Sequence, residues 1–143
     1  MGIVVDHLEA AVAFFTELGM ELEGEAQIEG AVADRILGGF DGARSSIAMM
    51  RTPDGHGKLE LTQFHDPEAT VGGPLDPPPP NTLGLHRVMF AVDDIDDIDD
   101  TITRLRRHGA ELLGDVAEYE NACRLCNLRG PSGIIVSLAQ EIG

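Results

Sequence analysis

The chain has 143 residues, of which 43% are hydrophobic and 4% aromatic, so it can bury an aliphatic core in one domain or in two fused halves. Its formal net charge of −15 argues against nucleic acid and anionic membrane surfaces as partners, because like charges repel. The apolar runs are too short to span a bilayer, and no signal-peptide pattern precedes the first periodic segment, so a cytoplasmic location is expected.

The chain opens with the pattern of a strand followed by a helix. A short β-branched run at residues 2–5 predicts the strand, and apolar residues then recur at helical spacing as far as Gly19. Asp6 is expected to cap the helix, with Glu9 completing a capping box, and Gly19 is a good helix stop. A strand, a helix and a stop are therefore predicted for the first twenty residues.

Strand patterns follow this helix. They are predicted at residues 20–26, 31–37, 45–51 and 58–64. Asp41 and Gly42 form a hairpin signal before the third of these segments. With some irregular chain allowed within 27–40, the first half reads as a βαβββ module.

A linker rich in glycine and proline separates this module from the rest of the chain. It covers residues 66–81 and contains four consecutive prolines at 77–80, which favour extended chain and cannot lie within a helix. The sequence therefore predicts a first module at 1–65 and a second at 82–143.

The same pattern restarts after the linker. A strand is predicted at 88–92, a capped helix start at 93–96, and a helix stop at Gly109. Further strands are predicted at 110–113, 122–128 and 134–139. An internal repeat of this kind indicates one domain built from two copies of one supersecondary unit.

The two cysteines have the spacing of a metal or redox motif. Cys123 and Cys126 lie in a strand pattern, however, and residues three apart in a strand point to opposite faces. We therefore interpret them as ordinary strand cysteines.

Four segments, taken in order, resemble the vicinal-oxygen-chelate superfamily of glyoxalases, bleomycin-resistance proteins and extradiol dioxygenases. The resemblance is carried by Gly2-Ile3-Val4-Val5-Asp6-His7-Leu8-Glu9-Ala10-Ala11, Leu59-Glu60-Leu61-Thr62, Phe90-Ala91-Val92-Asp93-Asp94-Ile95 and Gly130-Pro131-Ser132-Gly133-Ile134-Ile135-Val136. It implies an α+β fold in which two tandem βαβββ modules form a cupped, partly open mixed barrel. It also implies a homodimer, and a metal held in the cavity by one histidine, glutamate or glutamine from each of four strands.

Carrying the family's metal ligands onto this chain leaves the set incomplete. The first ligand falls immediately before Met1, the second is Glu60, the third is Arg87, and the fourth is Ser137, where the family usually has glutamate. A divalent metal is therefore doubtful, because arginine is a permanent cation and a lone carboxylate holds a transition metal poorly.

His86 is the alternative third ligand, beside Arg87. Val88 and Phe90 form an apolar set that should face the helix, so strand alternation places Arg87 with Met89 in the cavity and His86 on the other side. A β-bulge would reverse this assignment. Either a histidine upstream of Met1 completes part of the metal site, or the site is rebuilt around Arg87 for an anionic or carbonyl-bearing ligand, and we favour the second explanation.

Three functions follow from the resemblance. The first is a lyase or isomerase acting on a small carbonyl or acyl compound, with Glu60 as the base, Arg87 stabilising the oxyanion, and Met89, Ser137 and Thr62 lining the pocket. The second is a binding protein of the bleomycin-resistance type that holds a small molecule without chemistry. A ring-cleaving dioxygenase is third, since two of the three residues of its iron site are missing. Each of the two charged residues also has a structural alternative. Glu60 is then an edge carboxylate paired with a nearby basic residue, and Arg87 is the ion-pair partner of Glu60.

Overall fold

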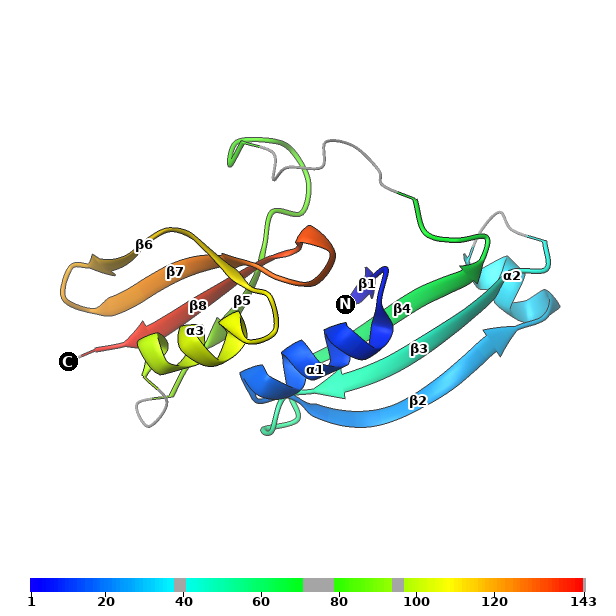
Figure 1. Cartoon of the computed structure of the whole chain (residues 1–143), viewed down its shortest axis with the longest axis horizontal. Helices are drawn as coiled ribbons and strands as arrows, with labels where there is room; N and C mark the ends of the chain where they lie inside the picture. Colours follow the sequence, from blue (N-terminus) through cyan, green and yellow to red (C-terminus); the bar gives the residue numbers. More distant parts are fainter. Residues whose placement is uncertain (38–40, 71–78, 94–96, 143) are drawn as a thin grey trace. The chain divides into compact units, whose positions relative to one another are not determined.

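A computed structural model describes residues 1–37, 41–70, 79–93 and 97–142 of the chain. The chain forms two compact units, Met1–Gly72 and Gly73–Gly143, each with its own four-stranded mixed sheet (Figure 1). The predicted α+β class and the repeated strand–helix–strand pattern are confirmed.

The first unit contains four strands and two helices. They are β1 (Gly2–Val4), α1 (Leu8–Leu18), β2 (Glu21–Glu29), α2 (Ala31–Leu37), β3 (Arg44–Arg51) and β4 (Lys58–Asp66). The sheet order is β1-β4-β3-β2, with β1 parallel to β4 and the other neighbours antiparallel. Helix α1 packs on one face of this sheet, against β2, β3 and β4.

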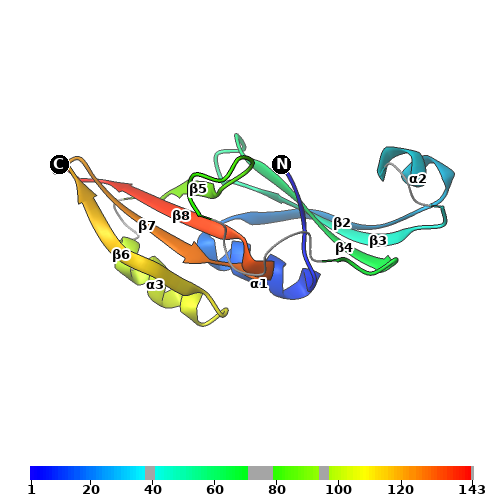
Figure 2. The ribbon, with the colours of Figure 1, turned by 90° about the horizontal axis from the view of Figure 1, so that it is seen from above.

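The second unit repeats this arrangement with one long helix. Its elements are β5 (Val88–Ala91), α3 (Ile98–Arg106), β6 (Glu111–Tyr119), β7 (Cys123–Arg129), a 3₁₀ turn (Pro131–Gly133) and β8 (Ile135–Glu141). The sheet order is β5-β8-β7-β6, with β5 parallel to β8 (Figure 2). Strand for strand, this is the order of the first sheet.

A glutamine on the last strand of each sheet fixes the start of the helix that packs on it. Gln63 Oε1 accepts a hydrogen bond from the Leu8 N–H at 2.8 Å, and Gln140 Oε1 accepts one from the Ile98 N–H at 3.1 Å. These N–H groups have no partner within the helix, so a side-chain acceptor from the sheet satisfies them. Each helix is thereby joined to its sheet at a defined position.

Apolar side chains on the helix face of each sheet make the core. Phe14 and Phe15 of α1 are buried and meet edge to face, with ring centroids 5.2 Å apart. Leu61 of β4 and Leu138 of β8 are both fully buried on this side of their sheets. The few aromatic residues are thus supplemented by aliphatic packing, as the composition requires.

The predicted cap of α1 is wrong by one residue. His7, and not Asp6, is the N-cap, and its Nδ1 accepts a hydrogen bond from the Ala10 N–H at 3.2 Å. The predicted stop is confirmed, because Gly19 has a φ of 117°, a left-handed conformation that glycine adopts without strain. The sequence pattern could not distinguish two adjacent polar residues that can both cap a helix.

The predicted strand at 31–37 is also wrong, since these residues form α2. Asp34 of this helix accepts hydrogen bonds from the N–H groups of Gly42, at 2.9 Å, and Ala43, at 3.0 Å. The Asp41–Gly42 pair therefore belongs to a helix-to-strand connection and not to a hairpin. Residues 38–40, which complete this connection, lie outside the described residues.

Helix α3 begins later than predicted. Its N-cap is Asp97, whose side chain accepts a hydrogen bond from the Asp99 N–H at 3.3 Å. The predicted start at 93–96 is thus displaced toward the C-terminus, although residues 94–96 themselves lie outside the described residues. A run of aspartates offers several capping positions, and the contact with Gln140 selects one of them.

Both cysteines lie in β7 and are free thiols. Cys126 pairs with Leu138 and is buried, whereas Cys123 pairs with Glu141 at the strand's start. An odd separation within one strand puts them on opposite faces, as the sequence predicts. No helix in the described part of the chain is long and apolar enough to cross a membrane.

Candidate functional site

Each sheet has one face covered by its own helix and an opposite face, which we call the open face. The strand registers assign residues to these faces, because neighbours in register point the same way. In the second sheet, Met89 of β5, Ser137 of β8 and Asn127 of β7 are in register across three strands. These three side chains therefore lie side by side on the open face of the second unit.

A short polar network joins them to Arg87. Ser137 Oγ donates a hydrogen bond to Asn127 Oδ1 at 2.5 Å, and Arg87 Nη1 lies 3.5 Å from the same oxygen. Ser137 is buried and Arg87 is exposed, so the serine end is anchored in the sheet while the guanidinium group meets solvent. Arg87 can accordingly turn most of its five N–H donors toward a ligand.

These residues line a small cavity of about 140 Å³. Its walls are Arg87, Met89, Asp115, Ala117, Leu125, Cys126, Asn127 and Ser137. The cavity thus combines one cation, one carboxylate, a serine–asparagine pair and several apolar side chains, the mixture typical of a small-molecule site.

The alternation expected for β5 is found in the structure. Val88 and Phe90 are half-buried and pair with the buried Val136 and Leu138 of the helix face, whereas Met89 is 48% exposed. His86 lies just before the strand, is half-buried, and does not line the cavity that Arg87 lines.

Glu60 lies on the open face of the first sheet. It is exposed on β4 and is in register with Gly2 of β1 and Met49 of β3. Thr62, two residues further along the same strand, is buried and is in register with Val4 and Ile47. Glu60 and Thr62 therefore share one face, as the strand period requires.

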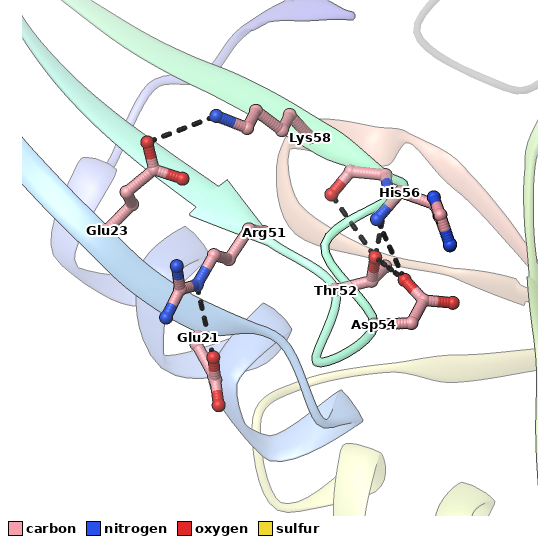
Figure 3. A network of polar contacts seen from close by, with 8 residues as sticks. Glu21, Glu23, Arg51, Thr52, Asp54, His56 and Lys58 are labelled. Atoms are coloured by element: carbon pink, nitrogen blue, oxygen red, sulfur yellow. Dashed lines mark hydrogen bonds and ion pairs between the residues drawn. The ribbon is translucent and has the colours of Figure 1, made fainter.

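Two cations on the same open face, Lys58 and Arg51, are paired with other carboxylates. Lys58 Nζ is 3.2 Å from Glu23 Oε1, and Arg51 Nε is 3.1 Å from Glu21 Oε2 (Figure 3). Both pairs are solvent-exposed, so they organise this end of the sheet more than they stabilise it. Glu60 is not a partner in either pair.

Glu60 and Ser137 occupy equivalent positions in the two units. Each lies three residues before the glutamine that caps its unit's helix, Gln63 in one case and Gln140 in the other. These are the residues that the sequence places at the second and fourth metal-ligand positions of the family. Arg87 lies two residues before Met89, the register partner of Ser137.

These residues do not make a metal-binding set. Arg87 brings positive charge to the third position, and the Ser137 hydroxyl at the fourth is engaged with Asn127. Among the described residues, no three or more histidine, cysteine, aspartate or glutamate side chains gather where they could hold a metal ion. Of Glu60, Arg87 and Ser137, only Glu60 is a usual metal ligand, and a lone carboxylate holds a transition metal poorly.

Two polar residues of the cavity, Asn127 and Asp115, were not predicted. Asn127 carries a polar side chain on the open face, which it shares with Leu125 and Cys123 and which alternates with the buried Cys126 and Leu128. Its polarity is a local signal, but its contact with Ser137 depends on which strands are neighbours. Asp115 lies where the register of β6 shifts, between Leu113 and Ala117, and only the glycine before it hints at this irregularity.

Among the described residues, three groups outside the Arg87–Asn127–Ser137 network have shifted pKa values. The hydrogen bond to Asp99 raises the pKa of Arg124, which also binds Asp97. This arginine therefore pairs with the two carboxylates at the N-terminus of α3. Burial raises the pKa of the Cys126 thiol, which disfavours the reactive thiolate. The hydrogen bond donated by the Thr52 hydroxyl lowers the pKa of Asp54 in the β3–β4 turn.

Comparison with known proteins gives a consistent family. The family model described as Glyoxalase/Bleomycin resistance protein/Dioxygenase superfamily matches residues 1–138. A search of curated proteins gave no match.

Solved structures similar to this chain include a protein with a related sequence and others that share the fold. A glyoxalase family protein from Bacillus cereus is 46% identical over 100% of this chain and 92% of its own, with a TM-score of 0.89. A glyoxalase/bleomycin resistance protein/dioxygenase domain from Frankia is 19% identical, covering 98% of this chain and 87% of its own, with a TM-score of 0.63. A fosfomycin resistance protein from Listeria monocytogenes, complexed with Mn(II), is 11% identical, covering 98% and 88%, with a TM-score of 0.60. The last two show a shared fold only.

Proposed function

We propose that this chain, which belongs to the glyoxalase/bleomycin resistance protein/dioxygenase superfamily, binds a small organic anion on the open face of its second sheet. Arg87 is the partner of the anion's carboxylate or other oxyanion. One observation carries the proposal, namely an exposed guanidinium group beside a cavity that also presents Met89 and Ser137. This is the sequence-based hypothesis of an arginine-centred pocket, applied to the second unit.

The polar network supports such binding because Asn127 contacts the guanidinium group of Arg87 but leaves its other N–H donors available to a ligand. At 3.5 Å, the contact with Asn127 is at the weak end of hydrogen bonding, so a carboxylate would be the stronger partner. Ser137 holds Asn127 on the other side at 2.5 Å. The amide oxygen is thereby kept beside the guanidinium group when no ligand is bound.

Binding without chemistry corresponds to the bleomycin-resistance type of member. The Listeria neighbour, whose name includes fosfomycin resistance, has a Mn(II) ion in its structure, but at 11% identity it lends only the fold. A homodimer and a cytoplasmic location stay predictions.

Proton abstraction by Glu60 is the second candidate function. Its carboxylate is exposed on the open face of the first sheet, at the position equivalent to Ser137, and it takes no part in the ion pairs of Arg51 and Lys58 on that face. As a base it would remove a proton next to a carbonyl group of a bound substrate. This corresponds to the lyase or isomerase predicted from the sequence.

Binding is tested with a matched pair of small molecules. Titration of 4-methylpentanoate followed by protein NMR is expected to shift the amide signals of Met89 and Ser137, whereas the uncharged 4-methylpentanamide should shift them far less. Arg87→Met should weaken carboxylate binding by about tenfold or more, the size of a charge-assisted hydrogen bond. Arg106→Met is the control, since Arg106 is exposed on α3. Equal binding of acid and amide would refute the proposal.

Proton abstraction is tested by deuterium exchange. In D₂O, 4-methyl-2-oxopentanoate should lose its C3 protons faster with the protein than without it. Glu60→Gln should remove the acceleration, and Glu118→Gln, a change at an exposed carboxylate of β6, should not. An unchanged rate for Glu60→Gln would reject Glu60 as the base while leaving the binding proposal intact.

A further inference from the structure

Two opposite charges line the open-face cavity of the second unit without forming an ion pair. Arg87 and Asp115 both contribute to its wall, and no salt bridge joins them in the described part of this unit. A cavity of about 140 Å³ places them within the span of a single small molecule. Opposite charges held apart in one small site suit a ligand that carries both charges.

Asp115 reaches the cavity because of an irregularity in β6. The register shifts between Leu113 and Ala117, and Gly114 takes a φ of 73°, a left-handed conformation that favours glycine. Bulges of this kind redirect a side chain at the edge of a sheet and are frequent beside functional sites. The shift thus places a carboxylate at the rim of the cavity.

The equivalent irregularity in the first unit has a different outcome. The register of β2 shifts between Leu22 and Gly24, so the extra residue is Glu23. Glu23 is neutralised by Lys58 at 3.2 Å. Asp115, by contrast, forms no ion pair in the described part of the chain and lines the cavity beside the exposed Arg87.

Long-range electrostatics favour a ligand of zero net charge. The chain carries a formal net charge of −15, so a free anion is repelled as it approaches, whereas a zwitterion is not. At close range, the carboxylate of a zwitterion matches the guanidinium fork of Arg87 and its ammonium group matches Asp115. Met89 and Leu125 offer apolar contact to a short aliphatic side chain.

We infer that the ligand of this cavity is a small zwitterion of the α-amino acid type, bound between Arg87 and Asp115 with its side chain against Met89 and Leu125. The inference rests on the proposed function, since it names the ligand class of the same site. Asp115 is the residue that selects this class over simple carboxylates.

The test compares three probes that share one aliphatic group: leucine, 4-methylpentanoate and 3-methylbutylamine. Protein NMR titrations on the whole chain are expected to give leucine an affinity about tenfold higher than that of 4-methylpentanoate, with the amine weakest. Asp115→Asn should abolish the preference for leucine while leaving 4-methylpentanoate binding in place. Glu118→Gln, which changes an exposed carboxylate on the same strand, should preserve the preference.

The outcomes separate this inference from the proposed function. Equal affinities for leucine and 4-methylpentanoate, or a preference that survives Asp115→Asn, would overturn the amino acid class and leave the anion site standing. Binding of none of the three probes at millimolar concentration would overturn both. Amide spectra of Asp115→Asn that match the unchanged protein outside β6 would show that the variant is folded.

Discussion

The two units share one frame and differ on their open faces. In both, the first and last strands of the unit are parallel, and a glutamine of the last strand accepts a hydrogen bond from the first N–H of the helix. The two units can be compared at the position three residues before this glutamine. At that position the first unit has Glu60, beside Met49, and the second has Ser137, beside Asn127. The same backbone therefore presents an exposed carboxylate in one unit and a hydrogen-bonded serine in the other.

This difference teaches which face carries fold and which carries function. The helix faces repeat because both must bury apolar side chains and satisfy the same helix N–H groups. The open faces differ because the fold does not require any particular polar group on them. Function should accordingly be sought where the repeat fails, and in the second unit it fails around Arg87.

The largest expected effect tests whether the helix faces are equivalent. Leu61→Ala and Leu138→Ala should each lower the free energy of unfolding by about 2–5 kcal/mol, because both side chains are fully buried and each change leaves a cavity. Urea denaturation combined with hydrogen exchange would assign each loss to its unit. Leu22→Ala is the control, since Leu22 is 45% exposed. A cost near that of the control for one variant alone would show that the two cores are not equivalent.

The next largest loss of stability is expected from the two glutamines that accept a hydrogen bond from the first N–H of a helix. Gln140→Met keeps the side-chain volume but leaves the buried Ile98 N–H without an acceptor, at a cost of about 1–3 kcal/mol. Gln63→Met should cost less, because Gln63 is only half-buried and water can replace it. Thermal denaturation should rank Gln140→Met below Gln63→Met in stability. The reverse ranking would show that burial does not set the strength of this contact.

A smaller effect comes from the ion pairs at the start of α3. Arg124 binds Asp97 at 3.1 Å and Asp99 at 2.9 Å, whereas the N-cap of α1 is His7, whose Nδ1 accepts a hydrogen bond from the Ala10 N–H. Arg124→Met should destabilise the second unit less than Gln140→Met does, and the loss should shrink as salt screens the exposed carboxylates. A loss independent of salt, measured by urea denaturation at two ionic strengths, would assign the role of Arg124 to packing.

The smallest effect on stability is expected in the turn between β3 and β4. In the β3–β4 turn, the Thr52 hydroxyl lowers the pKa of Asp54, so this carboxylate stabilises the folded state once pH exceeds its unfolded pKa. That contribution is lost as pH falls through the lower folded pKa. Thr52→Val should therefore cost more stability at neutral pH than in acid, where only the loss of the Gly57 N–H bond to Thr52 Oγ1 remains. An equal cost at both pH values would contradict the assignment.

Local patterns predicted most of the repeat but not the contacts made across it. Period-two alternation placed Val88 and Met89 on opposite faces, and Gly19 ended α1 as expected. The start of α3 was misplaced because Gln140, distant in sequence, selects Asp97 as its cap. The strand predicted at 31–37 is wrong because apolar and small residues in so short a segment fit either a strand or a helix pattern.

The candidate site was predicted in the same uneven way. Arg87 and Ser137 followed from the resemblance and from strand alternation. Asn127 and Asp115 did not, because their importance depends on which strands are neighbours and on a register shift in β6. Such facts belong to the folded sheet, and no local sequence pattern encodes them.

The central claim is that the second open face binds an anion through Arg87 and needs no metal to do so. The most direct measurement is titration of 4-methylpentanoate into the protein before and after treatment with a strong chelator, with metal content followed by elemental mass spectrometry. The account predicts the same affinity in both samples and its loss in Arg87→Met. Binding that disappears with the chelated metal and returns when the metal is restored would contradict it.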